Sequence, residues 1–185
     1  MRRAYVLVEG DADANFLRRV LNPDVQKDVE FVPAGGSAAI PSLARSLLVR
    51  RRVPVAVFTD SDSLNPTVIK ERQQSLEELI ELAAASVPVK VVVAVPEMEA
   101  CFFAAPEVIE RVLGRKIPPE LIPLGKRDPK GVLDHLAGGG KRKWDTRQAI
   151  QAMDGNDIER IRAAPPIQEL TKFLQGLPQL VPAGS

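Results

Sequence analysis

Short apolar runs alternate with amphipathic segments over the first half of the chain, and this alternation restricts the fold more than any other feature of the sequence. Four runs rich in β-branched residues stop at polar or turn-forming residues, as buried strands do. Segments with apolar residues at helical spacing follow the first three runs, and capping residues or prolines mark their ends. We expect strands at residues 4–8, 29–33, 53–59 and 89–95, and helices at 11–21, 38–50 and 66–85.

Strands that alternate with helices pair in parallel, because each helix carries the chain back across one face of the sheet. The sequence therefore predicts an α/β fold, Rossmann-like, with a four-stranded parallel sheet and flanking helices, and we take 2-1-3-4 as the order of its strands. Beyond about residue 106 the strand pattern stops, and amphipathic stretches at residues 130–136, 146–153, 158–163 and 167–174 indicate a helical C-terminal extension. We expect an α/β core in residues 1–105, a helical part packed on it in residues 106–180, and a loose tail in residues 181–185.

Composition indicates the cellular setting. With 185 residues, 45% of them hydrophobic, the chain can bury a core without disulfides or structural metal. The single cysteine, Cys101, lies among apolar residues, which predicts a buried thiol and a reducing compartment. The sequence has no leader-like N-terminal pattern and no apolar stretch of membrane-spanning length, so we expect a cytoplasmic protein that does not contact a membrane.

Acidic side chains follow the predicted strands. In an open parallel sheet the ligand site lies beyond the carboxyl ends of the strands, where the winding reverses, so these side chains should converge. Crowded carboxylates repel one another unless a cation lies among them. Oxygen ligands without a His/Cys cluster suit Mg²⁺ or Mn²⁺ better than zinc or copper. The candidate ligands of one or two such ions are Glu9, Asp13, Asp60, Asp62 and Glu99.

Other acidic residues have simpler interpretations. Asp11 is placed to cap the first predicted helix. Glu97 and Glu99 both fall on the first turn of the next helix, where acidic side chains also favour the helix dipole. Of these two, Glu99 is the better candidate for a metal ligand.

These residues resemble the Toprim domain found in topoisomerases, primases, ribosomal-RNA maturases and the overcoming-lysogenization-defect (OLD) nucleases. The likeness rests on Val8-Glu9-Gly10 with Asp13, on Asp60-Ser61-Asp62, and on an acidic strand-to-helix element over residues 95–102. It is strongest to the Toprim part of the OLD family and its small stand-alone relatives, and it covers roughly residues 4–136. The resemblance implies a Toprim fold and supports Glu99 as the acid that precedes a small residue and a bulky one.

The resemblance also implies a role for a lysine. Asp128-Pro129-Lys130 is similar to a proline–lysine pair that opens a later helix in the OLD group, where the lysine steadies the charge that develops on the phosphate. The chain has no Walker motif, and its only tyrosine, Tyr5, lies inside the first predicted strand, which argues against topoisomerase chemistry. A separately encoded ATPase could then be a partner.

Our leading hypothesis is a Mg²⁺- or Mn²⁺-dependent nuclease that hydrolyses phosphodiester bonds of DNA or RNA by two-metal chemistry, in phage defence or DNA repair. Glu9, Asp60 and Lys130 are the expected catalytic residues. The alternative is a non-catalytic Toprim-like module that binds nucleic acid or a partner ATPase. A receiver domain fits less well, because no fifth strand supplies its lysine, and a haloacid-dehalogenase site needs Asp-x-Asp after the first strand instead of the third.

Basic residues are the candidates for contact with nucleic acid. The net charge of +1 does not decide the question, and each basic run could equally be a solvated loop or helix face. Trp144 could stack on a base or anchor a helix to the core, and we favour the anchor. His135 is more typical of a packing or surface residue. Gly35-Gly36-Ser37 could seat a phosphate or form a plain turn. The expected nucleic-acid contacts are Lys126, Arg127, Lys141, Arg142 and Lys143.

Overall fold

A computed structural model describes residues 2–139 and 143–178 of the chain. The predicted tail at residues 181–185 and two of the basic residues, Lys141 and Arg142, lie outside the described residues. The strands are β1 (Ala4–Val8), β2 (Val29–Pro33), β3 (Val55–Asp60) and β4 (Val89–Ala94). The helices are α1 (Asp11–Val20), α2 (Pro23–Gln26), η1 (Ser37–Ala39), α3 (Ile40–Arg51), α4 (Pro66–Glu81), η2 (Met98–Ala104), α5 (Pro106–Leu113), α6 (Leu121–Gly125), α7 (Pro129–Gly138), α8 (Thr146–Ala152), α9 (Gly155–Arg162) and α10 (Pro165–Gly176).

The predicted fold class is confirmed. The four strands form an all-parallel sheet in the order β2-β1-β3-β4, with helices on both faces and a helical C-terminal part. Strands β1 and β2 have the predicted bounds, whereas β3 begins after Pro54 and extends to Asp60. Helix α4 ends before the predicted residue 85, where Ala85 and Ser86 have positive φ angles that a continuing helix does not allow.

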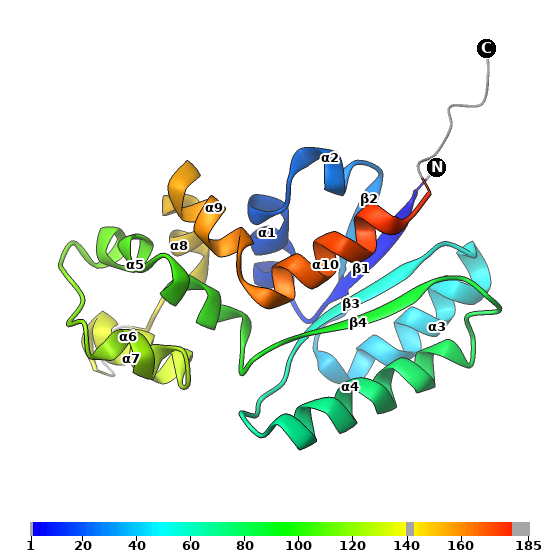
Figure 1. The fold of residues 1–185 in the computed structure, drawn as a ribbon, viewed down its shortest axis with the longest axis horizontal. Helices are drawn as coiled ribbons and strands as arrows, with labels where there is room; N and C mark the ends of the chain where they lie inside the picture. The colour runs from blue at the N-terminus through cyan, green and yellow to red at the C-terminus, as the bar shows by residue number, and fades with distance from the viewer. Residues whose placement is uncertain (1, 140–142, 179–185) are drawn as a thin grey trace, which may run out of the picture.

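Alternate residues of the buried strands serve two separate cores. Leu7, Val57 and Val91 pack with helices α3 and α4 on one face of the sheet. Val6, Phe58 and Val92 face the opposite way and pack with α1 and α10. Because both faces are covered, the central strands β1 and β3 are apolar over most of their length and lack the alternating pattern of a half-exposed sheet, whereas each of the edge strands β2 and β4 includes one charged residue. Figure 1 shows α3 and α4 below the sheet and α1 and α10 above it.

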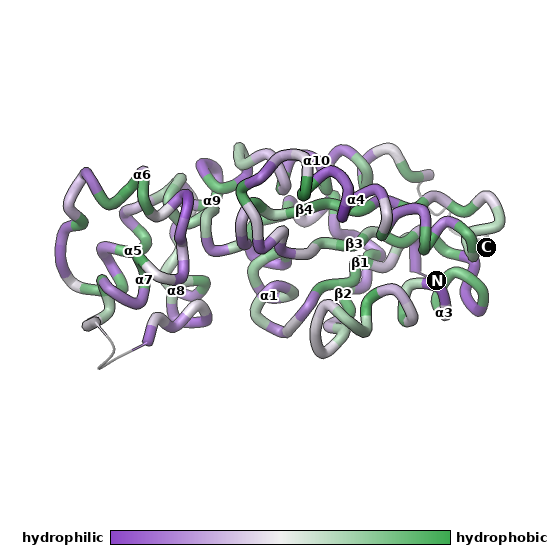
Figure 2. The backbone as a smooth tube through the Cα atoms, turned by 90° about the horizontal axis from the view of Figure 1, so that it is seen from below, coloured by the Kyte–Doolittle hydropathy of each residue, from purple (hydrophilic) through white to green (hydrophobic). Residues whose placement is uncertain are grey.

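The C-terminal helices occupy two places. Helices α5 to α8 form a lobe beyond the carboxyl ends of the strands, and α9 and α10 lead the chain back until α10 packs beside β4 (Figure 1). Figure 2 shows the lobe and the sheet side by side along the long axis of the molecule. The apolar core above the sheet continues into the lobe. Sequence patterning predicted α7 to α10 but not the short helices α5 and α6, and the division at residue 105 stays a prediction.

Phe102 joins the lobe to the sheet. Its ring is fully buried and meets Phe16 of α1 at a centroid distance of 5.6 Å and Trp144 at 6.1 Å, both edge to face. Trp144 therefore lies against the core, in the position of the anchor that we favoured. Among residues 2–139 and 143–178, no helix is both long and apolar enough to cross a membrane.

Candidate metal centre

Parallel strands bring the acidic residues to one edge of the sheet. Strand β1 ends opposite Phe58 of β3, and Asp60, the last residue of β3, lies opposite Ala94 of β4. Glu9 directly follows β1, while Glu97 lies three residues beyond β4, just before η2. The carboxyl ends of the strands face the lobe (Figure 1), so the acidic side chains lie at the junction of sheet and lobe.

Glu9 is held by the end of strand β3. Its Oε1 accepts a hydrogen bond of 2.6 Å from the Thr59 hydroxyl and one of 3.2 Å from the Asp60 N–H. Its carbonyl oxygen accepts from the N–H groups of Gly35 and Gly36, at 3.1 and 2.9 Å. These glycines have φ angles of +79° and +123°, where only glycine is unstrained. Both N–H groups are thus used within the chain, which favours the plain turn over the phosphate seat.

Asp13 and Asp60 each use one carboxylate oxygen to fix their orientation. Asp13 Oδ2 accepts a hydrogen bond of 2.8 Å from the N–H of Gly10, the residue that precedes α1. Asp60 Oδ1 accepts one of 2.8 Å from the N–H of Met98, the first residue of η2. The second oxygen of Asp60 faces the Lys130 ammonium at 3.5 Å.

Glu97 and Glu99 enter from the opposite side, on and just before helix η2. Glu99 is buried, and its Oε1 accepts a hydrogen bond of 3.3 Å from the Thr146 hydroxyl of α8. Glu97 Oε2 is buried without a hydrogen-bond partner among the described residues. An unpaired buried carboxylate oxygen is costly, and a cation is the simplest compensation. We call Glu9, Asp13, Asp60, Glu97 and Glu99 the acid cluster.

Lys130 reaches the acid cluster from the first turn of α7. Asp128 caps this helix by accepting the Gly131 N–H at 3.0 Å, and Pro129 begins it. The Lys130 ammonium lies 3.5 Å from Asp60 Oδ2, 3.3 Å from Glu97 Oε1 and 3.8 Å from Glu99 Oε2. The side chain of Lys130 is 53% exposed, so it neutralises the acids from the solvent side.

The electrostatics of the acid cluster favour an additional positive charge. The pKa of Asp60 is raised from its ordinary 3.8 to about 7, mainly by burial and to a smaller extent by the charges of Glu99 and Asp13, against the opposing effects of the Met98 N–H and Lys130. Burial likewise raises the pKa values of Asp13 and Glu99. Burial opposes the charge of Lys130, but Glu99, Asp60 and Glu97 outweigh it and raise the pKa of its ammonium.

These pKa shifts predict an unusual dependence of stability on pH. Between about pH 4 and pH 7 the folded protein holds more protons at Asp60 than the unfolded chain does, so the free energy of unfolding should fall as pH rises through this range. Without divalent ions, Asp60→Asn should therefore be more stable than the wild type at pH 8, by roughly 1–3 kcal/mol, and nearly equal to it at pH 4. Urea unfolding in EDTA across this range measures the difference. If the free energies of unfolding of the two proteins changed with pH in the same way, the expectation would be contradicted.

The donor chemistry of the acid cluster fits a hard divalent cation. All its ligating groups are carboxylates, one of them buried and the others half-buried, and oxygen ligands of this kind are those that Mg²⁺ and Mn²⁺ prefer. As the side chains lie, no three Asp, Glu, His or Cys residues in the described part of the chain are spaced to hold one ion together. The Lys130 ammonium lies between three of the carboxylates, so an ion shared by them requires this ammonium to move.

The remaining predicted residues in the described part of the chain lie outside the acid cluster. Asp62 is exposed, in a left-handed turn with φ of +50°, and its N–H donates to the Pro96 carbonyl. It borders the cluster without joining the ion pairs of Lys130, and its role as a ligand stays a prediction. Lys126 and Arg127 lie on the turn before α7, close to Lys130. Lys143 lies in the lobe beside Leu136 and Gln148.

Sequence reasoning ranked one acid of the site too low and missed two hydroxyl groups. Glu97 was ranked below Glu99, although both pair with Lys130. The hydroxyls of Thr59 and Thr146 hold Glu9 and Glu99 in place. Thr59 immediately precedes Asp60 at a strand end, which is a usable signal, whereas Thr146 lies 47 residues from Glu99 and the sequence has no signal for that contact.

Cys101 is buried beneath the site, as the sequence predicted. Burial raises the pKa of its thiol to about 12, with smaller contributions from the charges of Asp60 and Glu99. The thiol is therefore protonated at neutral pH and a poor nucleophile.

Comparisons with known proteins give a fold relationship. No protein-family model matches the sequence, and no curated protein matches it significantly. The C-terminal region of the OLD protein of Xanthomonas campestris pv. campestris superposes with a TM-score of 0.54 and 21% identity, covering 95% of each chain. The C-terminal region of the Burkholderia pseudomallei OLD protein gives a TM-score of 0.51 and 16% identity, covering 95% of this chain and 98% of that one. The chain therefore shares the fold of the C-terminal regions of OLD proteins.

Proposed function

We propose that this chain is a Toprim-type nuclease that uses Mg²⁺ or Mn²⁺ to hydrolyse phosphodiester bonds of DNA or RNA. The observation that carries the proposal is the acid cluster, where carboxylates from β1, α1, β3 and η2 meet a lysine from α7 at the carboxyl edge of the sheet. The fold shared with the C-terminal regions of OLD proteins supports the same assignment. A scaffold that only needed stability would not gather buried acids in this way, because their mutual repulsion is costly.

Each residue of the acid cluster has a distinct task in this proposal. Glu9 and Asp60 would hold the ion at the centre, since both are fixed by hydrogen bonds from β3 and η2. Asp13, Glu99 and the neighbouring Asp62 would hold a second ion, with Glu97 beside them. When bound, such ions supply an activated water and stabilise the leaving oxygen.

Lys130 would bind the substrate phosphate. Its ammonium is charged at neutral pH, is half exposed, and stands on the solvent side of the carboxylates, where a phosphate oxygen can replace a carboxylate as its partner. The N-terminal position of Lys130 on α7 adds the favourable field of the helix for an anion. The lysine thus orients the phosphate against the acid cluster.

A second function has one specific observation in its favour. Lys130 already compensates Asp60, Glu97 and Glu99 through three ion pairs, which is the arrangement expected of a module that needs no metal. Such a module would bind nucleic acid or a partner ATPase without cutting. Titration calorimetry separates the two functions, because only the nuclease binds Mn²⁺ at the acid cluster.

The proposed nuclease is tested by a cleavage assay with matched conditions. The purified chain is incubated with supercoiled, linear duplex and single-stranded DNA and with RNA, in Mg²⁺, in Mn²⁺, and in EDTA. We expect cleavage of at least one substrate with divalent ions and none with EDTA. Absence of cleavage in every arm, together with absence of Mn²⁺ binding, would reject the proposal in favour of the non-catalytic module.

Thr59→Val tests the positioning of Glu9. The change removes the hydroxyl that donates to Glu9 Oε1 and keeps the shape of the side chain. We expect cleavage to fall by about 10–100-fold at limiting Mn²⁺, with partial recovery at saturating Mn²⁺, because outer-shell partners of metal ligands have effects of this size. Thr171→Val on α10 makes the same chemical change away from the site and should leave activity unchanged. Equal rates for wild type and Thr59→Val at limiting Mn²⁺ would show that Glu9 needs no such support.

A further inference from the structure

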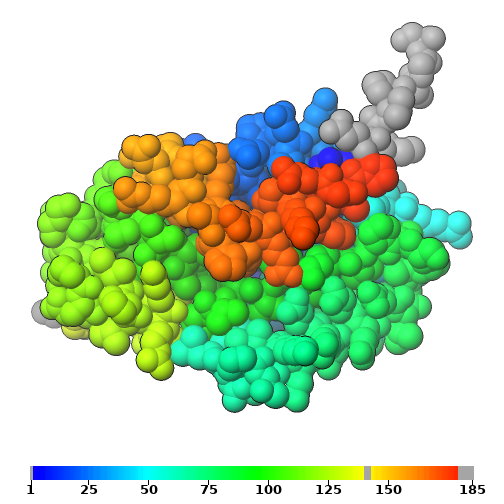
Figure 3. Space-filling view, in the orientation of Figure 1, coloured from blue at the N-terminus to red at the C-terminus, as the bar shows by residue number. Residues whose placement is uncertain are grey.

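A cavity of about 550 Å³ opens next to the acid cluster, at the carboxyl end of the edge strand β4. Its walls come from β4, η2 and the junction of α9 and α10, and they are mostly small and apolar, including Val93, Ala100, Ala104 and Ala163. We call it the β4 cavity. Figure 3 shows this face of the molecule, with α9 and α10 in orange and β4 and η2 in green. Volumes of this order suit a small organic group.

Glu97 belongs to the acid cluster and also lines the β4 cavity. It lines the cavity and also lies 3.3 Å from the Lys130 ammonium, so a group in the cavity is a direct neighbour of whatever Lys130 binds. A second cavity, of about 340 Å³, adjoins Glu97 on its other side and is lined by Asp62 and Arg127. Glu97 therefore lines both cavities.

Three cations lie between the end of α6 and the first turn of α7. Lys126 lines the β4 cavity, Arg127 lines the cavity beside Asp62, and Lys130 lies at the acid cluster. Within the described part of the chain, neither Lys126 nor Arg127 has a carboxylate in ion-pair range. Arg160 is a further cation of the β4 cavity, although it also pairs with Glu107 at 2.6 Å. Several cations on one short segment suit the phosphates of a nucleic-acid strand.

We propose that the β4 cavity receives the unstacked nucleotide next to the phosphate held at the acid cluster, so that the substrate is a single strand or an unpaired end. This inference rests on the proposed nuclease function and names its substrate class. Lys126, which lines the cavity, would contact a phosphate next to the inserted base. The small apolar walls accept any base by contact alone. Two carboxylates, Glu97 and Glu169, line the cavity beside the cations, and Glu169 is already paired with Lys90 at 2.8 Å. A stacked base within a duplex cannot enter without being unpaired, which costs free energy.

Binding of labelled oligonucleotides in Ca²⁺, measured by fluorescence anisotropy, tests the proposal. The wild type should bind a single strand at least tenfold more tightly than a blunt hairpin of the same composition. Ala163→Phe fills the cavity from an exposed position and should weaken single-strand binding about tenfold, while Ala163→Ser, which leaves the cavity open, should not. Lys126→Ala should weaken it several-fold, whereas Lys27→Ala, a similar change at the exposed end of α2, should have no effect.

The outcomes separate this inference from the nuclease function. Preserved single-strand binding in both Ala163→Phe and Lys126→Ala, with unchanged thermal unfolding, would overturn the inference and leave the cavity to another occupant, even if the wild type cleaves DNA. Equal affinity of the wild type for single strand and blunt hairpin would also overturn it. If the wild type never cleaves but the variants lose single-strand binding, the nucleotide site in the β4 cavity is supported and the nuclease function is rejected.

Discussion

Asp60→Asn is expected to abolish cleavage while the protein stays folded. Asparagine keeps the shape of the side chain and an oxygen that can accept the Met98 N–H, but it removes the charge that faces Lys130 and the proposed metal. We expect the rate to fall by about 10²–10³-fold or more, the size seen when one group that stabilises transition-state charge is removed. Rates on the best substrate of the wild type, at saturating Mn²⁺, measure the loss.

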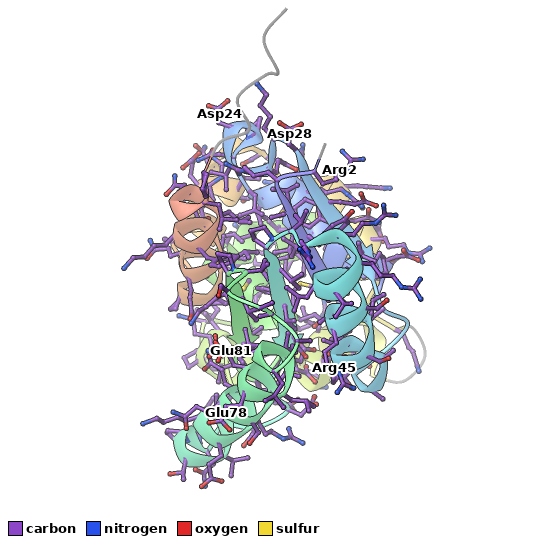
Figure 4. The ribbon with its side chains drawn as sticks, turned by 90° about the vertical axis from the view of Figure 1, so that its right-hand side faces the viewer. Arg2, Asp24, Asp28, Arg45, Glu78 and Glu81 are labelled. Atoms are coloured by element: carbon purple, nitrogen blue, oxygen red, sulfur yellow. The ribbon has the colours of Figure 1, made fainter. Side chains whose placement is uncertain are left out.

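The matched control is Asp24→Asn. This exposed aspartate lies on α2, which precedes the amino end of β2, and Figure 4 labels it. The control should cleave at the rate of the wild type. If Asp60→Asn retained more than a tenth of the wild-type rate, Asp60 would not hold the catalytic ion, and the acid cluster would need another explanation.

Phe102→Ala should cause the largest loss of stability of any change near the site. The ring is fully buried between Phe16 and Trp144, so its removal leaves a cavity where the lobe meets the sheet. We expect a loss of about 3–5 kcal/mol in the free energy of unfolding, measured by urea or thermal unfolding. Activity should fall at temperatures where the variant is still folded, because η2 carries Glu99 and follows Glu97.

Phe173→Ala is the matched control for this change. Phe173 on α10 is only partly buried and packs at the margin of the same core. Phe173→Ala should lower the free energy of unfolding by less than Phe102→Ala does, and it should leave cleavage unchanged. A similar loss of stability in both variants, with activity retained in Phe102→Ala, would show that the position of η2 does not depend on the aromatic contact.

The sheet was predictable because the central strands are buried on both faces and the edge strands are still mostly apolar, so that each forms a short apolar run. The parallel pairing followed from the alternation with helices, whereas the order 2-1-3-4 was assumed and the structure confirmed it. The helices of the lobe were harder to predict from the sequence, because α5 and α6 are short and lie among prolines. Their positions depend on packing against η2 and α7. Helix propensity alone does not determine such short segments.

The acid cluster was partly predictable. Glu9, Asp60 and Glu99 could be placed together because they follow neighbouring strands, and Lys130 came from the resemblance to the OLD group. The position of Asp62 could not be derived. Strand β3 ends at Asp60 and the next residues form a turn, so Asp62 does not continue the side-chain alternation of the strand. The pairing of Lys130 with Glu97 depends on how the lobe docks, and sequence spacing does not contain that information.

The position of Mn²⁺ in a crystal tests the central claim most directly. Crystals of the full chain are soaked in Mn²⁺, and anomalous scattering locates the ions without reference to activity. The account predicts one or two peaks within the acid cluster, bound by Glu9 and Asp60, with the Lys130 ammonium displaced from its present position between Asp60 and Glu97. A soaked crystal with no peak there, and with Lys130 still paired to these carboxylates at saturating Mn²⁺, would contradict it.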